Sequence, residues 1–451
     1  MKTLDIATLM GQFGGFFWMI IAFVVALSVI VAIHEYGHYI VGRWTGIHAE
    51  VFSLGFGPVL YSRIDKRGTV WQVAALPFGG YVKFAGDANA ASGIDGEAMA
   101  QIVDDPVARR RTMPGAPLWA RALTVAAGPV FNFALSIMIF FGVLMFTGQP
   151  SDPLTVADLK KMPGETTELR EGDRILGIEG QNFDGFEAAV SWALTTPPSS
   201  SVLNYDIERD GESLTVTGPF LAPARVGNIA PLSAASDAGL RQGDVITHIN
   251  GREITAFLEM KDIVESSDGN GLDLSVWREG AELQVVLKPK RVDEPLPEGG
   301  FQTQWRIGIM NGLAFEPATE AADVGTALYN SVRQVGRIIE GSISGLGHMI
   351  TGAISTCNLS GPIGIAQTSG AMASQGAQSF IWFIAVLSTA VGLLNLFPIP
   401  ALDGGHLVFY AYEAVVGRPP SDGALRILMG IGLTMVLTLM VFALGNDLFC
   451  P

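Results

Sequence analysis

The sequence contains few charged residues and only two cysteines. Charged residues make up 16% of the 451 residues, against roughly a quarter in an ordinary soluble domain, which argues against a purely soluble protein. The hydrophobic share of 49% is too high for a disordered chain. Cys357 and Cys450 are too few for a disulfide framework or a multi-cysteine zinc module. Nothing in the sequence brings these two together, so we interpret them as free thiols, with a disulfide as the alternative.

Basic residues are outnumbered as well. The chain has 28 Lys and Arg against 43 Asp and Glu, a formal net charge of −15. A nucleic-acid partner requires a basic surface. The charge balance therefore predicts no nucleic-acid partner.

Four uncharged apolar runs stand out, at residues 16–33, 123–146, 379–402 and 427–444. Each is long enough to cross a hydrocarbon core of ~30 Å as a helix, whereas buried helices of soluble proteins are usually shorter. The first run continues into His34 and Glu35 without a small-residue cleavage site, so we interpret it as a retained span and not a signal peptide. We expect a polytopic α-helical protein in the lipid bilayer, with transmembrane helices at 14–41, 121–147, 378–402 and 425–446.

The short loops predict the orientation of these spans. Residues 42–122 carry nine Lys and Arg, and Arg418 and Arg426 lie between the third and fourth runs. Because basic loops stay in the cytoplasm, both termini and the long insert at 148–377 are expected outside it. The insert is too long for its own charges to influence the orientation.

The insert contains an internal repeat. Residues 169–180 recur as residues 240–251, with seven of twelve positions identical, and each copy is followed by a helical stretch and a hairpin signal. We expect two tandem copies of one small β-rich module. The amphipathic stretch at 321–350 that follows is predicted either to lie at the membrane surface or to pack on the second module.

The strongest chemical signal is His34-Glu-Tyr-Gly-His38 at the end of the first run. Two histidines four residues apart share one face of a helix, and Glu35 beside them can act as a general base on a metal-bound water. Ionisable residues within a span are costly and are functional candidates by default. A structural histidine pair with a snorkelling glutamate is the alternative.

Catalytic zinc usually takes three protein ligands and leaves one position for water. Asp403, His406 and Glu413 near the third run have ligand chemistry, and spacing does not choose among them. The prolines and glycines around Asp403 predict a broken helix. Such backbone persists at membrane depth only where protein or a watery cavity satisfies its polar groups.

The His34–His38 motif, followed by Asn-Leu-Phe-Pro-Ile-Pro-Ala-Leu-Asp-Gly-Gly at 395–405, resembles the site-2 protease family of intramembrane zinc metalloproteases. The Leu-Arg-x-Gly-Asp-x-Ile-x-x-Ile-x-Gly repeat resembles PDZ domains, which bind extended peptides at a sheet edge. Residues 226–229 look like the loop of the second copy that receives a terminal carboxylate. Four spans with two PDZ-like modules between the second and third resemble the bacterial RseP-type branch of the family.

This resemblance implies a role for individual residues. It implies one zinc ion per chain on His34, His38 and Asp403, with Glu35 as the catalytic general base. Strand formers at 51–84, with a turn at 65–68, match a sheet that dips into the membrane. Substrate-contacting positions are then expected at Asn395, Pro398, Pro400, Gly55, Gly57, Gly79 and Gly80, and polar neighbours of the site at Asn132 and His406.

The expected domains are a first membrane half (1–147, with the β-region at 51–85), PDZ-like domains at 148–224 and 225–310, an amphipathic linker region at 311–377, and a second membrane half (378–451). The resemblance implies a bacterial inner-membrane endopeptidase whose partners are single-span substrates, such as anti-sigma factors or signal peptides, after an upstream site-1 protease has trimmed them. The PDZ-like pair would act as a size filter or as a spacer. A metal transporter and a PDZ-bearing scaffold with a degenerate zinc motif are the alternative classes.

Overall fold

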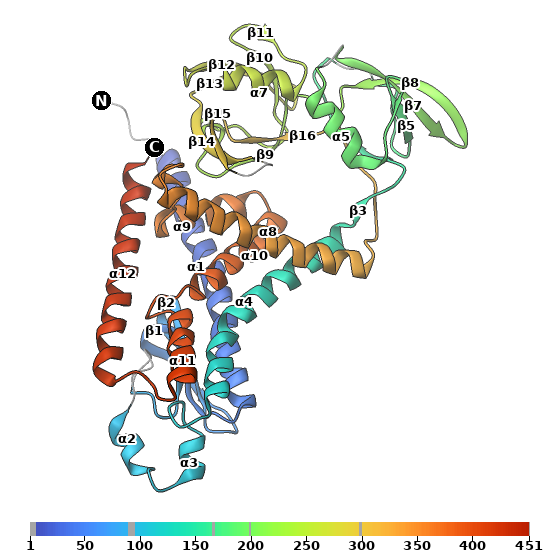
Figure 1. Cartoon of the computed structure of the whole chain (residues 1–451). Coiled ribbons are helices and arrows are strands. Elements are labelled where there is room, and N and C mark those ends of the chain that lie inside the picture. The colour runs from blue at the N-terminus through green and yellow to red at the C-terminus, as the bar shows by residue number, and fades with distance from the viewer. Residues whose placement is uncertain (1–5, 89–94, 165–166, 198–199, 297–299, 451) are drawn as a thin grey trace, which may run out of the picture. The chain divides into compact units, whose positions relative to one another are not determined.

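The computed structural model describes residues 6–88, 95–164, 167–197, 200–296 and 300–450 (Figure 1). The chain forms two compact units. The helical unit comprises Met1–Val143, Ala327–Gly347 and Thr356–Pro451, and the insert unit comprises Leu144–Thr326 and His348–Ser355. The candidate site lies in the helical unit.

Among the described residues, four helices are long and apolar enough to cross a membrane, as the sequence predicted. They are α1 (Ile6–Trp44), α4 (Leu118–Thr147), α10 (Ala377–Asn395) and α12 (Asp422–Phe449). The third helix ends at Asn395, not at residue 402 as expected. Pro398 and Pro400 follow within five residues, and proline cannot donate an N–H to a helix and disfavours helical backbone before it. Helix α11 (Asp403–Val416) then begins at Asp403.

Helix α8 (Val324–Ile350) corresponds to the predicted amphipathic stretch. Val335 forms a cluster with Phe140 of α4 and Ala385 of α10, all nearly inaccessible to solvent. The helix therefore packs on two candidate spans through this cluster. Val324, Leu328, Val332 and Ile343 are exposed, so part of the apolar side of the helix is not covered.

The predicted β-region is a long hairpin of β1 (Ala49–Ile64) and β2 (Val70–Phe84). The Asp65 carboxylate closes the predicted turn by accepting the N–H groups of Arg67 and Thr69. The hairpin also folds back, because residues 51–54 pair both with 80–83 and with 70–73. One edge of this sheet is therefore the segment 80–84. Two short helices, α2 (Gly96–Gln101) and α3 (Pro106–Arg110), precede α4.

The interpretation of Cys357 and Cys450 as free thiols is wrong, because they form a disulfide. The bond joins the short helix η1 (Thr356–Asn358), which precedes α9 (Pro362–Ser374), to the end of α12. The Asp447 carboxylate reinforces this junction by accepting the N–H groups of Gly361, Ile363 and Gly364. The cysteines are 93 residues apart, so sequence separation gave no sign of this proximity.

The two copies of the repeated motif fold with the same order of elements. The first has β5 (Arg174–Ile178), β6 (Gln181–Asn182), α5 (Gly185–Thr195), β7 (Val202–Arg209) and β8 (Glu212–Pro219). The second has β10 (Val245–Ile249), β11 (Arg252–Glu253), α7 (Phe257–Glu265), β12 (Leu272–Arg278) and β13 (Ala281–Leu287). In each copy the strands lie in equivalent order, β6-β5-β7-β8 and β11-β10-β12-β13.

The aspartate of the repeated Gly-Asp pair makes the same contacts in both copies. Asp173 accepts two hydrogen bonds from Arg209 and one from the Arg170 N–H. Asp244 accepts the equivalent bonds from Arg278 and from the Arg241 N–H. Burial acts to raise the pKa of the Asp173 carboxyl, but these hydrogen bonds hold that pKa below its usual value. The repeated Gly-Asp pair thus places a buried aspartate that forms an ion pair with an arginine of a neighbouring strand in each copy.

The remaining strands of the insert unit correct two expectations. Residues 226–229 are not a carboxylate-binding loop, because β9 (Arg225–Ile229) is an inner strand between β10 and β16 (Ile309–Gly312). The expected linker from residue 311 begins instead with strands, since β17 (Phe315–Pro317) pairs with β4 (Val156–Leu159). The Phe315 side chain lies in the core of the first module. The chain therefore returns to the first module after completing the second.

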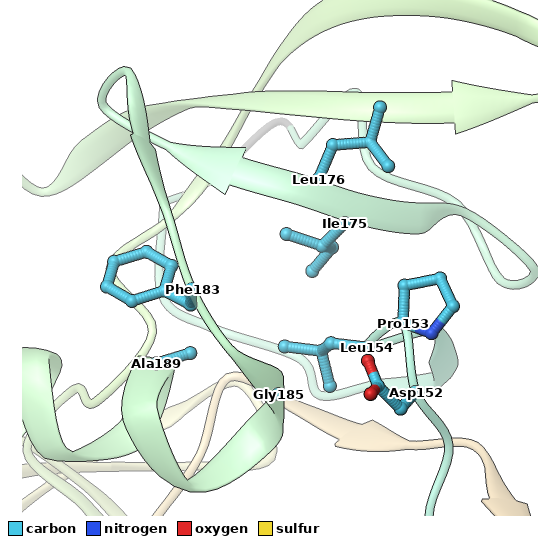
Figure 2. A pocket seen from close by; sticks show the side chains of 8 residues that line it. All are labelled: Asp152, Pro153, Leu154, Ile175, Leu176, Phe183, Gly185 and Ala189. Carbon is cyan, nitrogen blue, oxygen red and sulfur yellow. The ribbon is translucent and has the colours of Figure 1, made fainter.

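Further short elements complete the insert unit: β3 (Gln149–Pro150) paired with β18 (Thr319–Glu320), helix α6 (Ala234–Asp237), and the hairpin β14 (Lys290–Pro295) with β15 (Phe301–Arg306). The first module contains a cavity of about 120 Å³, and Figure 2 shows the side chains that line it. Its lining is largely apolar, including Leu154, Ile175, Phe183 and Ala189, and the Asp152 carboxylate lies at its border. This cavity contains none of the predicted zinc ligands.

Candidate active site

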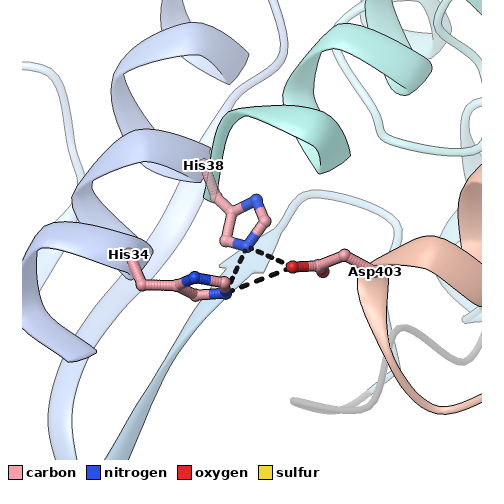
Figure 3. Close-up of side chains that lie close together, drawn as sticks. All are labelled: His34, His38 and Asp403. Carbon is pink, nitrogen blue, oxygen red and sulfur yellow. Dashed lines mark hydrogen bonds and ion pairs between the residues drawn. The ribbon is translucent and has the colours of Figure 1, made fainter. Parts of the chain in front are cut away.

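The two histidines of the first span and Asp403 point toward one another (Figure 3). The Nε2 atoms of His34 and His38 are 3.2 Å apart. The Asp403 Oδ2 atom lies 3.2 Å from His34 Nε2 and 3.5 Å from His38 Nε2. All three side chains are largely buried, with at most 18% of the side chain exposed. Helix α1 supplies both histidines because residues four apart share a face, and the first turn of α11 supplies Asp403.

The spacing of these three atoms fits a tetrahedral metal ion. Ligand bonds of ~2.0–2.2 Å in tetrahedral geometry place neighbouring ligand atoms about 3.3–3.6 Å apart, close to the distances found here. Asp403 Oδ2 has no hydrogen-bond donor among the described residues, although a buried carboxylate oxygen normally has one. Two imidazoles and a carboxylate are also the donor types that zinc takes in catalytic sites.

Backbone and side-chain groups of α4 contact the outer nitrogens of both histidines. His38 Nδ1 lies 2.9 Å from the Thr124 carbonyl oxygen, which can only accept, so Nδ1 carries the proton and Nε2 is left as an acceptor. His34 Nδ1 lies 3.2 Å from the Asn132 amide. Outer contacts of this kind orient metal-binding histidines and fix their tautomers. Asn132, which the sequence suggested only as a polar neighbour, therefore touches a candidate ligand.

Sequence reasoning missed the role of Gly128. A Cβ at this position of α4 would lie 2.3 Å from His38 Nε2 and 2.8 Å from His34 Cε1, which no real side chain tolerates. Position 37 likewise has no room for a side chain, since a Cβ added to Gly37 would lie 2.6 Å from the Ala127 carbonyl oxygen. Glycines at both positions let α1 and α4 approach closely enough for α4 to border the histidine pair. Glycine inside an apolar helix often marks a close contact between helices, so these two glycines could have indicated this contact from the sequence.

Two more glycines shape the approach of Asp403. A Cβ on Gly404 would lie 2.3 Å from the Phe397 carbonyl oxygen, and one on Gly405 would lie 2.4 Å from the Ile399 carbonyl oxygen. The start of α11 therefore packs directly against the backbone that follows α10. The glycines that follow Asp403 in the motif are required for this close contact.

Glu35 lies against the β-hairpin. A Cβ on Gly80 would lie 3.2 Å from Glu35 Cγ, so the edge segment 80–84 passes beside the predicted general base. Gly55, Gly57 and Gly79 have positive φ of 89°, 83° and 154°, which glycine adopts without strain. The structure thus brings Gly80 to Glu35 and gives the other three glycines a conformational role in the hairpin.

The other predicted positions are more dispersed. Asn395 donates a hydrogen bond to the Val391 carbonyl of its own helix, and no described contact joins it to the three candidate ligands. Pro398 is exposed and Pro400 is partly exposed in the segment after α10. His406 lies on α11, with its ring edge-on to Phe409 at 6.0 Å between centroids. Glu413 forms an ion pair with Arg121, so of the three candidate third ligands only Asp403 joins the histidines in the described part of the chain.

The comparisons with known proteins agree with this chemistry. The profile of peptidase family M50 matches residues 22–439. A protein of Agrobacterium fabrum named "Putative zinc metalloprotease" is 35% identical over 449 residues, covering 98% of each chain. A Rhizobium meliloti protein of the same designation is 35% identical over 433 residues, covering 94% of this chain and 95% of its own. The "Regulator of sigma-E protease RseP" of Escherichia coli is 31% identical over 478 residues, covering 96% of this chain and 98% of its own.

A peptidase family that matches nearly the whole chain favours the protease over the transporter and the scaffold. The predicted family is confirmed by both the profile and the relatives. The chain belongs to peptidase family M50, the site-2 protease family, and is a zinc metalloprotease of that type.

Proposed function

We propose that the chain is an intramembrane endopeptidase that cleaves single-span membrane proteins within their transmembrane helix. The observation that carries the proposal is the convergence of His34, His38 and Asp403, with both histidines on a helix long enough to cross the bilayer. Ionisable groups placed there are costly. A protease that acted only on soluble peptides would not need its candidate metal ligands on such a helix.

In this proposal His34, His38 and Asp403 hold the zinc ion and Glu35 is the general base. Zinc, when bound, acts as a Lewis acid that polarises the scissile carbonyl and makes a water molecule more acidic. Glu35 accepts the proton of the attacking water and delivers it to the nitrogen of the leaving amine. The Thr124 carbonyl holds His38 in the required tautomer.

The sheet edge beside Glu35 is the proposed substrate cradle. A peptide bond within a helix has its hydrogen-bonding groups occupied, so the substrate must unwind before attack. An unwound segment can add to a sheet edge through main-chain hydrogen bonds, and the segment 80–84 runs beside Glu35 at Gly80. Asn395, Pro398 and Pro400 are proposed to contact the same segment, and Gly55, Gly57 and Gly79 to shape the hairpin.

The two repeated modules are proposed to be tandem PDZ domains that filter substrates by size. They are proposed to lie on the extracytoplasmic side of the bacterial inner membrane, where both termini of the chain lie as well. Their equivalent strand order and the matched Asp173 and Asp244 contacts support one ancestral module. Substrates would be anti-sigma factors or leftover signal peptides, trimmed first by a site-1 protease. The name of the Escherichia coli relative, a regulator of sigma-E, supports the first of these classes.

The function is tested by removing and restoring zinc. The purified full-length chain in detergent is incubated with a single-span substrate that lacks an outer domain, before and after treatment with a chelator, and the products are identified by mass spectrometry. We expect cleavage within the transmembrane segment, its loss after chelation and its recovery with zinc, because zinc supplies the Lewis acid. Cleavage that survives complete zinc removal, or that occurs only outside the transmembrane segment, would contradict the proposal.

The filter is tested by excising the modules. Residues 149–150 pair with 319–320, so the ends of the excised segment 151–318 already lie side by side and can be joined by a short glycine-serine linker. A deletion ending at residue 306 would instead leave the strands at 309–317 without their partners. We expect faster cleavage of a substrate with a bulky outer domain and unchanged cleavage of the trimmed one. Equal cleavage rates of the bulky substrate with and without the modules would rule out the proposal that the modules filter substrates by size.

A further inference from the structure

We propose that Asn132 is a positioning residue that selects the nitrogen through which His34 binds zinc. The inference rests on the zinc site proposed above. It assigns to Asn132 the task of holding the His34 proton on Nδ1, so that the Nε2 lone pair faces Asp403 and His38.

The Asn132 amide lies directly beside the His34 ring. The residue is fully buried, with 0% of its surface exposed, and its Nδ2 atom lies 3.2 Å from His34 Nδ1. Its backbone is firmly held, because its carbonyl oxygen accepts hydrogen bonds from the hydroxyls of Ser136 and Ser388. A buried side chain on an anchored helix turn keeps its contact to His34 without a further ordering cost.

The two ends of the Asn132 amide have opposite hydrogen-bonding chemistry, since Oδ1 accepts and Nδ2 donates. With Nδ2 toward His34, the amide donates to Nδ1, and the imidazole proton is forced onto Nε2, where it would block a metal. With Oδ1 toward His34, the amide accepts the Nδ1 proton and leaves Nε2 free. The two orientations have nearly the same shape. Because Oδ1 has no hydrogen-bond partner among the described residues, a half-turn of the amide breaks no bond that Oδ1 now makes.

The outer nitrogens of His34 and His38 face different kinds of hydrogen-bonding group. His38 faces the Thr124 carbonyl, which accepts a proton and cannot donate one, so its tautomer is fixed by the backbone. His34 faces a group that can do either. The tautomer of His34 is therefore set by a side chain, and this side chain can be changed by mutation without altering the backbone.

The test compares Asn132→Leu, which removes both hydrogen-bonding atoms, with Asn132→Asp, which keeps only acceptors. Zinc affinity of the full-length chain in detergent is measured by competition with a chromogenic chelator. We expect Asn132→Leu to bind zinc about 10–100-fold more weakly, the usual loss for an outer-shell partner, and Asn132→Asp to bind at least as tightly as the wild type. Thr389→Val, another buried polar-to-apolar change on a neighbouring helix, should leave the affinity unchanged.

A spectroscopic readout separates positioning from packing. The chain has six histidines, so ¹⁵N spectra of histidine-labelled, zinc-loaded protein can be assigned for His34 with a His34→Ala variant. We expect a protonated Nδ1 on His34 in the wild type and in Asn132→Asp. Wild-type zinc affinity in Asn132→Leu, equal weakening in the Leu and Asp variants, or an unprotonated Nδ1 in the wild type would overturn the inference. Wild-type zinc affinity in His34→Ala would instead overturn the proposed zinc site itself.

Discussion

Replacing Glu35 by glutamine is expected to leave zinc bound and to lower the rate of substrate cleavage about 10²–10⁴-fold, the usual contribution of a general base. The substitution keeps the size of the side chain beside Gly80 but removes its ability to accept a proton. None of the three converging ligand atoms belongs to Glu35, so the zinc content should not change. Single-turnover cleavage of a single-span substrate and metal analysis of the same sample provide the two measurements.

The matched control is Glu187→Gln, the same chemical change at an exposed position of α5. This variant should cleave at the wild-type rate. Full activity in Glu35→Gln would rule out Glu35 as the base. Loss of zinc together with activity would mean that Glu35 supports the metal and would leave the identity of the base open.

The spans and the histidine pair were predictable because their signals are local. Apolar runs of this length have few alternatives to a transmembrane helix, and positions 34 and 38 share a helix face wherever the helix lies. The convergence of Asp403 with the histidines was not local. The residues alone left Asp403, His406 and Glu413 equivalent, and only the resemblance chose Asp403, because the choice depends on how the chain turns after α10.

Two other features depended on contacts between distant segments. The disulfide joins residues 93 apart, and loop length says nothing about which ends meet. The return of the chain at Phe315 to the first module is invisible in the repeat, since β17 lies outside both copies of the motif. The sequence shows glycines at 37 and 128, but it does not show why they are needed. The reason is the close approach of α1 and α4, which only the structure shows.

Glu413 illustrates how such a contact changes the interpretation of a residue. The sequence alone made Glu413 a candidate metal ligand, but in the structure Arg121 donates two hydrogen bonds to its carboxylate, of 2.6 and 3.0 Å. The guanidinium also lies over the Tyr410 ring at 5.1 Å. Arg121 belongs to α4, while Glu413 and Tyr410 belong to α11, the helix that begins at Asp403. The ion pair therefore anchors the helix that carries the third candidate ligand.

Removing either partner of this pair is expected to destabilise the helical unit strongly. With 13% of the Arg121 side chain and 17% of the Glu413 side chain exposed, Glu413→Ala leaves a nearly buried charge without an opposite charge beside it, which costs about 3–5 kcal/mol. The double variant Arg121→Met with Glu413→Leu should recover most of this loss, because an apolar pair of similar volume replaces both charges. Thermal unfolding of the detergent-solubilised chain provides the measurement.

The exposed pair Arg174–Glu208 is the matched control, with 45% and 34% of the side chains exposed. Glu208→Ala should change stability by about 0–1 kcal/mol, as is usual for surface pairs. Because α11 starts at Asp403, Glu413→Ala should also weaken zinc binding, and the apolar double variant should restore it. Equal small effects at both pairs would show that α11 is held by its apolar contacts, Leu407 and Tyr410 against the cluster around Phe52 and Phe84. A large loss of stability with unchanged zinc affinity would separate the anchoring of α11 from the placement of Asp403.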